Sequence, residues 1–338
     1  MSMRAFAYQR PASVDDAIAL LGTSGASGST RLLGGGTDLL TLMKADLVAP
    51  DRLVDVKRLG DFPDTIEVTA EGLVLGGRAT LADVETHELV GQLYPALSDA
   101  AGSAATPQLR NMATVAGNLL QRPRCWYFRN ARFDCWLKGG DDCPAREGEN
   151  QLHALFAGSP CVAVHPSDLA SALLALDATV RIRGPHGERA VPMAAFFAQP
   201  TDDRRTETTV HADELVLSVT VPPLADGARN IYLKAMDRKV WAFALAGAAV
   251  SLRIDDGKIA NARVVLGAVA PVPWRCEAAE RALNGSEPRD EVFASAADAA
   301  LEGATPLTHN AYKVPLAKGL IRRALASLTD EASRLVSA

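Results

Sequence analysis

The sequence predicts an α+β protein of two or three domains. Its 338 residues exceed what one ordinary hydrophobic core organises. Hydrophobic residues make up 48% of the chain and charged residues 22%, close to the average of globular proteins. The pattern also changes twice along the chain, near residue 60 and near residues 222–230. Near residue 60 a βαβ pattern gives way to mixed strands and helices. Near residues 222–230 a second α+β pattern begins.

Composition argues against several classes of function. The chain has 35 Lys and Arg against 40 Asp and Glu, and the resulting net charge of −5 argues against general nucleic-acid binding. No run of apolar residues approaches the roughly 18 that a transmembrane helix needs, so we expect no membrane partner. The N-terminal segment lacks the apolar centre of a signal peptide. We therefore expect a cytoplasmic protein, or a periplasmic one that is co-exported with a partner.

The first region has a βαβ pattern. A short strand is predicted over residues 4–8, and Ser13 with Asp16 resembles a capping box that starts a helix. Apolar residues then recur at helical spacing, namely Val14, Ala17, Ile18 and Leu21. The other elements expected here are a Gly/Ser-rich loop at 22–29, strands at 30–33 and 54–56, and a helix at 39–44.

The second and third regions combine hairpins with helices. Alternating apolar residues predict a hairpin from 65–69 to 72–75, and Asp255–Lys258 is a turn signal between strands at 243–254 and 262–269. The remaining predictions are helices at 81–89, 93–101, 168–177, 276–283, 292–300 and 318–335 and a strand at 179–183. Residues 122–159 are polar, aromatic and cysteine-bearing without periodicity. A loop of this length inside a compact domain is usually functional or disordered.

Two glycine-containing segments could bind a long anionic cofactor. Gly34–Gly36 follow a predicted strand and precede a predicted helix, so that backbone N–H groups could converge on a phosphate. The segment is neither a G-x-G-x-x-G motif nor a P-loop, and a simple tight turn would also explain it. A second turn at Thr114–Asn118 offers a hydroxyl, a glycine and an amide. Together the two turns suit a dinucleotide, and Asp38 beside the first fits a ribose or turn-capping carboxylate better than a general base.

At these segments the sequence resembles the flavin-binding subunits of the molybdenum hydroxylase family. That family includes xanthine dehydrogenases, aldehyde oxidases, aerobic carbon monoxide dehydrogenases and 4-hydroxybenzoyl-CoA reductases. Five segments match in order and rough spacing over nearly the whole chain: Leu32–Leu39, Ala113–Asn118, His165–Leu169, Glu214–Ser218 and Tyr232–Ala235. Ala116 departs from the pattern, because relatives often have glycine there. We therefore expect a negative φ at Ala116.

The resemblance implies a fold of three parts. A PCMH-type FAD-binding region would consist of a small α/β domain at 1–57 and a larger α+β domain at 58–225. The larger domain would contain an insertion at about 121–165, and a C-terminal α+β flavoprotein domain at 226–338 would cover the flavin. The implied cofactor residues are Leu32, Leu33, Gly34, Gly35, Gly36, Thr37, Asp38 and Leu39 around the pyrophosphate, Thr114, Gly117 and Asn118 at a second phosphate-side turn, Asp168 at the adenosine end, and Val216 and Lys234 near the isoalloxazine. A lysine there could stabilise negative charge on reduced flavin, although a solvated surface lysine is the alternative for Lys234.

Four of the five cysteines lie close together in the sequence. Cys125, Cys135, Cys143 and Cys161 follow C-x9-C-x7-C-x17-C, which is neither a zinc ribbon nor a compact ferredoxin motif. Four thiolates suit a [4Fe–4S] cluster or a structural zinc ion, while disulfides would need an oxidising compartment. Residues 121–146 carry six basic and three acidic side chains, which favours an anionic thiolate site without choosing its metal. Cys276, on a predicted amphipathic helix, is expected to be a buried small hydrophobe.

The resemblance favours iron and sulfur. Most flavin subunits of the family lack this insertion, whereas a subset carries a cysteine-bearing insertion that binds an extra [4Fe–4S] cluster. The segments Arg124–Arg129 and Asp142–Ala145 look most like those of bacterial periplasmic-type aldehyde oxidases. All four cysteines are the expected ligands, and His153 within the loop is expected near the cluster. The aromatic residues Trp126, Tyr127, Phe128 and Trp136 are expected to shield the cluster from water or to form a subunit contact.

The implied function is electron transfer within a heterotrimeric molybdenum-dependent aldehyde oxidase or dehydrogenase. Electrons would pass from molybdenum through [2Fe–2S] clusters to FAD and then to an external acceptor. A large molybdopterin-binding subunit would hold the substrate, a small subunit would hold two [2Fe–2S] clusters, and this chain would hold no catalytic residue. The alternatives are the flavin subunit of a xanthine dehydrogenase or 4-hydroxybenzoyl-CoA reductase type enzyme, a zinc-stabilised scaffold or binding subunit, and a self-contained FAD oxidase.

Overall fold

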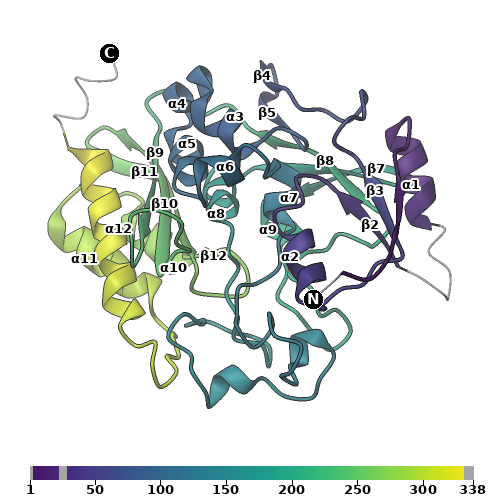
Figure 1. Ribbon diagram of the computed structural model, residues 1–338. Coiled ribbons are helices and arrows are strands. Elements are labelled where there is room, and N and C mark those ends of the chain that lie inside the picture. The colour runs from purple at the N-terminus through teal and green to yellow at the C-terminus, as the bar shows by residue number, and fades with distance from the viewer. Residues whose placement is uncertain (1–2, 23–28, 331–338) are drawn as a thin grey trace.

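Three β-sheets organise the chain (Figure 1). The structure is a computed structural model, and it describes residues 3–22 and 29–330. The sheets follow one another along the sequence, and an irregular loop lies below them in the view of Figure 1. The predicted α+β class is confirmed.

The N-terminal part is a small parallel sheet. Its elements are β1 (Ala7–Gln9), α1 (Val14–Gly22), β2 (Thr30–Leu33), α2 (Leu39–Lys44) and β3 (Arg52–Asp55). β3 lies in the middle and pairs in parallel with β1 and β2. α1 buries the four apolar residues that the helical spacing singled out, so the predicted helix and its inward face are confirmed.

The middle part is a five-stranded antiparallel sheet in the order β4-β5-β8-β6-β7. Its strands are β4 (Ile66–Thr69), β5 (Gly72–Gly76), β6 (Thr179–Gly184), β7 (Gly187–Pro192) and β8 (Leu215–Val221). Its helices are α3 (Leu81–Thr86), α4 (Glu88–Leu93), α5 (Pro95–Gly102), α6 (Pro107–Arg110), α7 (Val115–Leu119), α8 (Asp168–Ala175) and α9 (Met193–Phe196). Every residue of α8 is buried, which fits its almost wholly apolar sequence.

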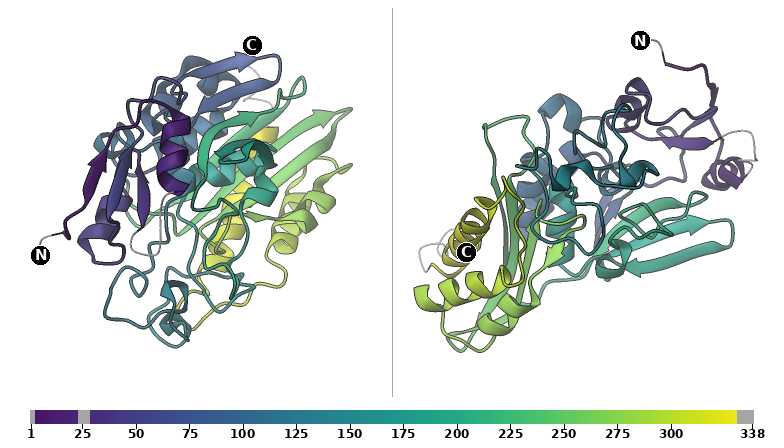
Figure 2. Two further views of the ribbon diagram at one scale, coloured as in Figure 1. Left: turned by 90° about the vertical axis from the view of Figure 1, so that its right-hand side faces the viewer. Right: turned by 90° about the horizontal axis from the view of Figure 1, so that it is seen from below.

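The C-terminal part is an antiparallel sheet covered on both faces. Its elements are β9 (Arg229–Ala235), β10 (Ala246–Asp255), β11 (Lys258–Gly267), β12 (Trp274–Arg275), α10 (Glu277–Leu283), α11 (Asp290–Ala300) and α12 (Lys313–Thr329). Alternate residues of β10 point to opposite faces: Ala248 and Val250 pack against α10–α12, and Ala249 joins the core of the middle part. The right view of Figure 2 shows the sheet between these two layers. The middle and C-terminal parts therefore share one packed interface.

The loop between α7 and α8 carries the clustered cysteines. It contains only two short 3-10 helices, at Trp136–Lys138 and Pro144–Arg146. Despite its irregularity it is anchored, because the N–H groups of Leu155 and Phe156 both donate to the carbonyl of Val269 in the C-terminal part. The ring of Phe156 also stacks on Trp274 with 4.5 Å between centroids.

Several predicted elements differ in extent. The helix expected over 81–89 ends at Thr86, since His87 adopts an extended conformation. The strand expected over 4–8 begins at Ala7. α12 begins five positions before the predicted 318, because Pro315 falls in its first turn, where proline is tolerated. Residues 331–335 of that predicted helix, and 23–28 of the predicted Gly/Ser loop, lie outside the described residues.

Candidate functional site

The first glycine segment connects β2 to α2 and lies against the second segment. Gly36 has φ +75°, a conformation that favours glycine. A Cβ added to Gly35 would lie 1.6 Å from the carbonyl oxygen of Met112. A Cβ on Gly34 would lie 3.3 Å from Thr114 Oγ1. Two segments about 80 residues apart in the chain therefore meet, as one bound cofactor spanning both would require.

The second segment is the start of a helix and not the expected turn. Thr114 is the N-cap of α7, and its hydroxyl accepts the N–H of Gly117 at 3.1 Å. Ala116 lies within this helix and is not among the residues with positive φ, as expected. Asn118 is buried, and its side-chain oxygen accepts the hydroxyl of Ser167, which in turn caps α8. The correction matters because the side chains of Thr114 and Asn118 are already used within the protein.

A cavity of about 590 Å³ lies between α2, the cysteine-bearing loop, the start of α8 and the loop before β10. Thr41, Cys125, Asp168 and Phe243 are among its lining residues. The buried Nε atom of Arg124, at the cavity wall, has no hydrogen-bond partner within the described part of the chain. Unpaired buried donors and acceptors are costly, so the cavity fits a polar ligand that would satisfy them.

Asp168 and Lys234, which the resemblance placed at opposite ends of the flavin, form one buried ion pair. Lys234 Nζ lies 2.7 Å from Asp168 Oδ2 and donates to the carbonyl of Ser103 at 2.9 Å. The hydroxyl of Tyr232 donates to the other oxygen of Asp168 at 2.5 Å. Burial raises the pKa of Asp168, while Lys234 and Tyr232 oppose that rise. The side chain of Lys234 is only 3% exposed, so it is not a solvated surface lysine.

Val216 lies in β8 and is 1% exposed within the core of the middle part. It is not among the residues that line the cavity. Its position near the isoalloxazine therefore stays a prediction.

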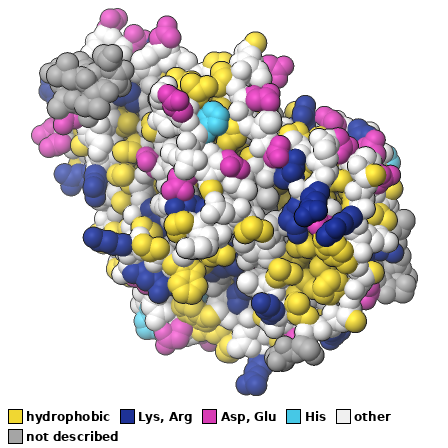
Figure 3. Space-filling model, turned by 45° about the horizontal axis from the view of Figure 1, so that its top comes forward, with side chains coloured by type: hydrophobic (Ala, Val, Ile, Leu, Met, Phe, Trp, Pro, Cys, Tyr) yellow, Lys and Arg dark blue, Asp and Glu magenta, His cyan; other side chains and the backbone are white. Residues whose placement is uncertain are grey.

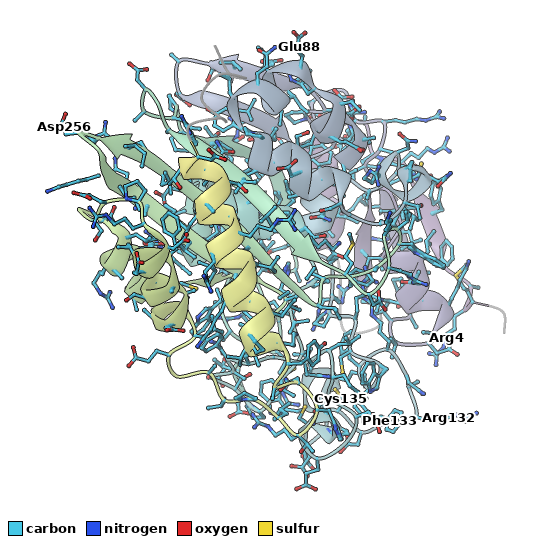
Figure 4. The ribbon with its side chains drawn as sticks, turned by 90° about the vertical axis from the view of Figure 1, so that its left-hand side faces the viewer. Arg4, Glu88, Arg132, Phe133, Cys135 and Asp256 are labelled. Atoms are coloured by element: carbon cyan, nitrogen blue, oxygen red, sulfur yellow. The ribbon has the colours of Figure 1, made fainter. Side chains whose placement is uncertain are left out.

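The four clustered cysteines lie in two adjoining apolar clusters. Cys135 and Cys161 are buried in one, Cys143 packs against the other, and Cys125 touches both and lines the cavity. None of the five cysteines, all of which lie in the described residues, forms a disulfide bond. In the described residues, no group of three or more His, Cys, Asp or Glu side chains is arranged to hold one metal ion. In Figure 4 Cys135 lies within the loop, and Arg132 and Phe133 lie at its outer edge.

The surroundings of these thiols suit metal-bound thiolates. Burial raises the pKa of Cys125 to about 11 and also raises the pKa values of Cys135 and Cys161. Backbone N–H groups oppose this: those of Tyr127 and Phe128 reach Cys125, and that of Ala163 donates to Cys161 Sγ at 3.4 Å. A bound cation would supply the remaining stabilisation of negative sulfur.

His153 contacts the cysteine cluster as expected. Its Nε2 lies 3.1 Å from Cys125 Sγ, and its ring packs edge-on against Trp126 at 5.1 Å. Burial lowers the pKa of His153 to about 4, so the ring is neutral near pH 7.

Cys276 is 3% exposed within the C-terminal core, which confirms the buried hydrophobe predicted there.

Sequence patterns missed two groups of cavity residues. Trp241 and Phe243 are 61% and 50% exposed at the cavity margin, and Arg124 lies over the ring of Phe243. Arg124 and Arg129 were visible only as part of a basic stretch, and their partner Asp38 lies far from them in the sequence. The surface view of Figure 3 shows acidic, basic and hydrophobic side chains sharing one face.

The fold and the two glycine segments define a class, the FAD-binding modules of molybdenum-dependent dehydrogenases. Residues 4–224 match the family model of the FAD-binding domain in molybdopterin dehydrogenase. Residues 231–328 match the C-terminal domain of the carbon monoxide dehydrogenase flavoprotein. The chain belongs to this family and is an FAD-binding oxidoreductase subunit. Within the described residues no helix is long and apolar enough to cross a membrane.

Individual relatives cover nearly the full length of the chain. The aldehyde oxidoreductase FAD-binding subunit PaoB of Escherichia coli (strain K12) is 40% identical, over 98% of this chain and 99% of that protein. The carbon monoxide dehydrogenase medium chain of Hydrogenophaga pseudoflava is 29% identical, over 95% and 96% of the two chains. A solved structure of carbon monoxide dehydrogenase from that organism, lacking the Mo-pyranopterin moiety of its cofactor, superposes with a TM-score of 0.77 at 28% identity, covering 97% of this chain and 98% of its own.

Proposed function

We propose that this chain is the electron-transfer subunit of a heterotrimeric molybdenum-dependent aldehyde oxidase or dehydrogenase, and that its insertion binds a [4Fe–4S] cluster. A large molybdopterin-binding subunit would hold the aldehyde, and a small subunit with two [2Fe–2S] clusters would deliver electrons to this chain. The observation that carries the proposal is that Cys125 of the insertion and Asp168 at the start of α8 line the same cavity.

The aldehyde assignment rests on degree of similarity. Identity to the aldehyde oxidoreductase subunit is 40%, against 24% to an Escherichia coli xanthine dehydrogenase FAD-binding subunit over 88% of this chain. A xanthine dehydrogenase type enzyme is thus the less favoured relative. Family membership likewise favours a flavoprotein over a zinc-stabilised scaffold.

The residues of this chain would hold the cofactors and control their surroundings. FAD, when bound, supplies a group that can accept electrons and pass them to an external acceptor. The paired Asp168 and Lys234 fix one end of the cavity, and the guanidinium groups of Arg124 and Arg129 favour anionic groups at its wall. Trp241 and Phe243 cover its margin with apolar surface that excludes water. Cys125, Cys135, Cys143 and Cys161 would bind the iron.

The test is to co-express the chain with its partner subunits, purify the complex, and measure flavin, iron, zinc and the visible spectrum. We expect FAD, and iron in excess of what the small subunit accounts for. Replacing Cys135 by serine should remove the additional iron, whereas the matched variant Cys276→Ser should retain it. Zinc in place of that iron would establish the scaffold-type site, and absence of flavin absorbance would contradict the proposal altogether. Aldehyde oxidation by this chain alone would instead support a self-contained oxidase.

A further inference from the structure

Asp38 is enclosed by the cysteine-bearing loop. Its Oδ1 lies 2.6 Å from Arg124 Nη1 and 2.7 Å from Arg129 Nη2. Its Oδ2 accepts the backbone N–H of Arg122 at 3.0 Å. The side chain is only 15% exposed. Both carboxylate oxygens are thus occupied by residues 122–129, which leaves little capacity for a ribose or phosphate ligand.

The same arginines shape the chain around Cys125. Arg124 directly precedes this cysteine, and the backbone N–H of Arg129 donates to the carbonyl of Cys125 at 2.9 Å. The Arg129 guanidinium also donates to the carbonyls of Pro123 and Arg122 at 2.7 and 2.8 Å. Holding Arg129 in place therefore fixes the backbone on both sides of Cys125.

Asp38 occupies the N-cap position of α2, directly after the glycine segment, yet its side chain makes no capping hydrogen bond. Its carboxylate instead forms ion pairs with Arg124 and Arg129 of the cysteine-bearing loop. The side chains of Arg124 and Arg129 are only 26% and 16% exposed. Without Asp38, two partly buried guanidinium groups would face each other beside Cys125.

We propose that Asp38 is a positioning residue that fixes the cysteine-bearing loop on the flavin-binding glycine segment and offsets the charge of Arg124 and Arg129. This replaces its expected role as a direct cofactor ligand, and it rests on the proposed [4Fe–4S] site. Because reduction adds negative charge to a cluster, nearby cations favour the reduced form and nearby anions oppose it. Asp38 and Arg129 should therefore shift the reduction potential of the cluster in opposite directions.

The experiment compares the intact wild-type complex with Asp38→Asn and Arg129→Met, and with Asp226→Asn as the control at an exposed carboxylate. The FAD content should stay at the wild-type level in Asp38→Asn and in Asp226→Asn. The cluster potential, measured by a redox titration followed by electron paramagnetic resonance, should rise in Asp38→Asn and fall in Arg129→Met. Opposite shifts distinguish this role from simple loosening of the loop, which would move both variants alike.

Loss of FAD in Asp38→Asn with an unchanged cluster potential would overturn the inference and restore the ligand role. If the wild-type complex proves to contain no such cluster, the proposed function is wrong about the cluster. Hydrogen exchange of residues 122–129 then tests whether Asp38 positions the loop. Exchange should be faster in Asp38→Asn than in Asp226→Asn, and equal rates would reject it. If Asp38→Asn does not assemble, Arg129→Lys, which keeps the charge but loses the paired donors, serves the same exchange measurement.

Discussion

At the scale of single residues, Gly35 is the position where the fold leaves least room. An added Cβ would lie 1.6 Å from the backbone oxygen of Met112, and a backbone atom cannot yield as a flexible side chain can. Gly35→Ala must therefore separate the two glycine segments. We expect a loss of stability of about 1–3 kcal/mol, in the range of overpacking changes, and reduced FAD occupancy.

The matched control for Gly35→Ala is Gly91→Ala. Gly91 lies in α4, and a Cβ there meets nothing within 4 Å. Alanine should therefore keep or slightly raise stability, since it is the better helix former. Denaturant unfolding and flavin fluorescence of the two purified variants provide the comparison. Equal FAD content in both would show that the close approach of the two segments is not needed for binding.

A second residue-scale prediction concerns pH. Burial lowers the pKa of His165 to about 3, whereas in the unfolded chain it titrates near its ordinary value of about 6.5. The folded form thus keeps His165 neutral while the unfolded form takes up a proton. The stability it contributes is fully present above about pH 6.5 and is lost as the pH falls towards 3, by up to about 1.4 kcal/mol per pH unit.

His165→Asn should therefore lose less stability than the wild type between pH 7 and pH 5, as measured by denaturant unfolding at each pH. His186→Asn, at an exposed histidine, should keep the wild-type pH dependence. An unchanged dependence in His165→Asn would mean that its ring is not held neutral in the folded protein.

At the scale of elements, residues at the start of α12 and just before it hold the cysteine-bearing loop by hydrogen bonds. Lys313 is fully buried, and its Nζ donates to the carbonyls of His153 and Ala268 at 3.0 and 2.6 Å. Asn310 donates to the carbonyls of His153 and Ala154. Lys313→Met would leave buried acceptors unpaired, which costs about 1–3 kcal/mol for each group.

We expect Lys313→Met to lower the free energy of unfolding by about 2–4 kcal/mol and to speed hydrogen exchange in residues 150–156. Lys318→Met on the same helix removes only an ion pair with Asp298 between a half-buried and an exposed side chain, so its effect should stay below about 1 kcal/mol. Similar stability of the two variants would show that the buried Lys313 side chain does not hold the loop.

Local signals explain which elements the sequence could predict. The helical spacing from Val14 to Leu21 and the turn between Asp255 and Lys258 depend on neighbours a few residues apart, and both are present. The pairing of Asp38 with Arg129 joins residues 91 positions apart, and that of Lys313 with Ala268 joins residues 45 apart. The periodicity of apolar residues gives no information on contacts between residues so far apart in the sequence. The same limit explains why the sequence motifs of Asp168 and Lys234 could be found while the ion pair between them could not be predicted.

At the scale of the whole molecule, the cysteine-bearing loop joins all three parts. It meets the N-terminal part at Asp38 and the C-terminal part at Val269. In the middle part, Arg205 donates to the carbonyls of Trp136 and Gly140 and lies over the indole of Trp136. The segment was predictable as an insertion from its cysteines and lack of periodicity. Its role as a junction follows only from contacts that no local pattern reveals.

Because the loop joins the three parts, loss of its cluster should raise the rate of hydrogen exchange in segments of all three. We expect Cys161→Ser to remove the additional iron and to speed hydrogen exchange in the loop, in the segment after Gly36 and in residues 305–313, since each is bonded to the loop. Cys276→Ser places a hydroxyl in the C-terminal core and should lower stability with iron retained and the segment after Gly36 unaffected. If Cys161→Ser loses iron and only the loop exchanges faster, the anchors hold the three parts together without the cluster, and the metal serves electron transfer alone.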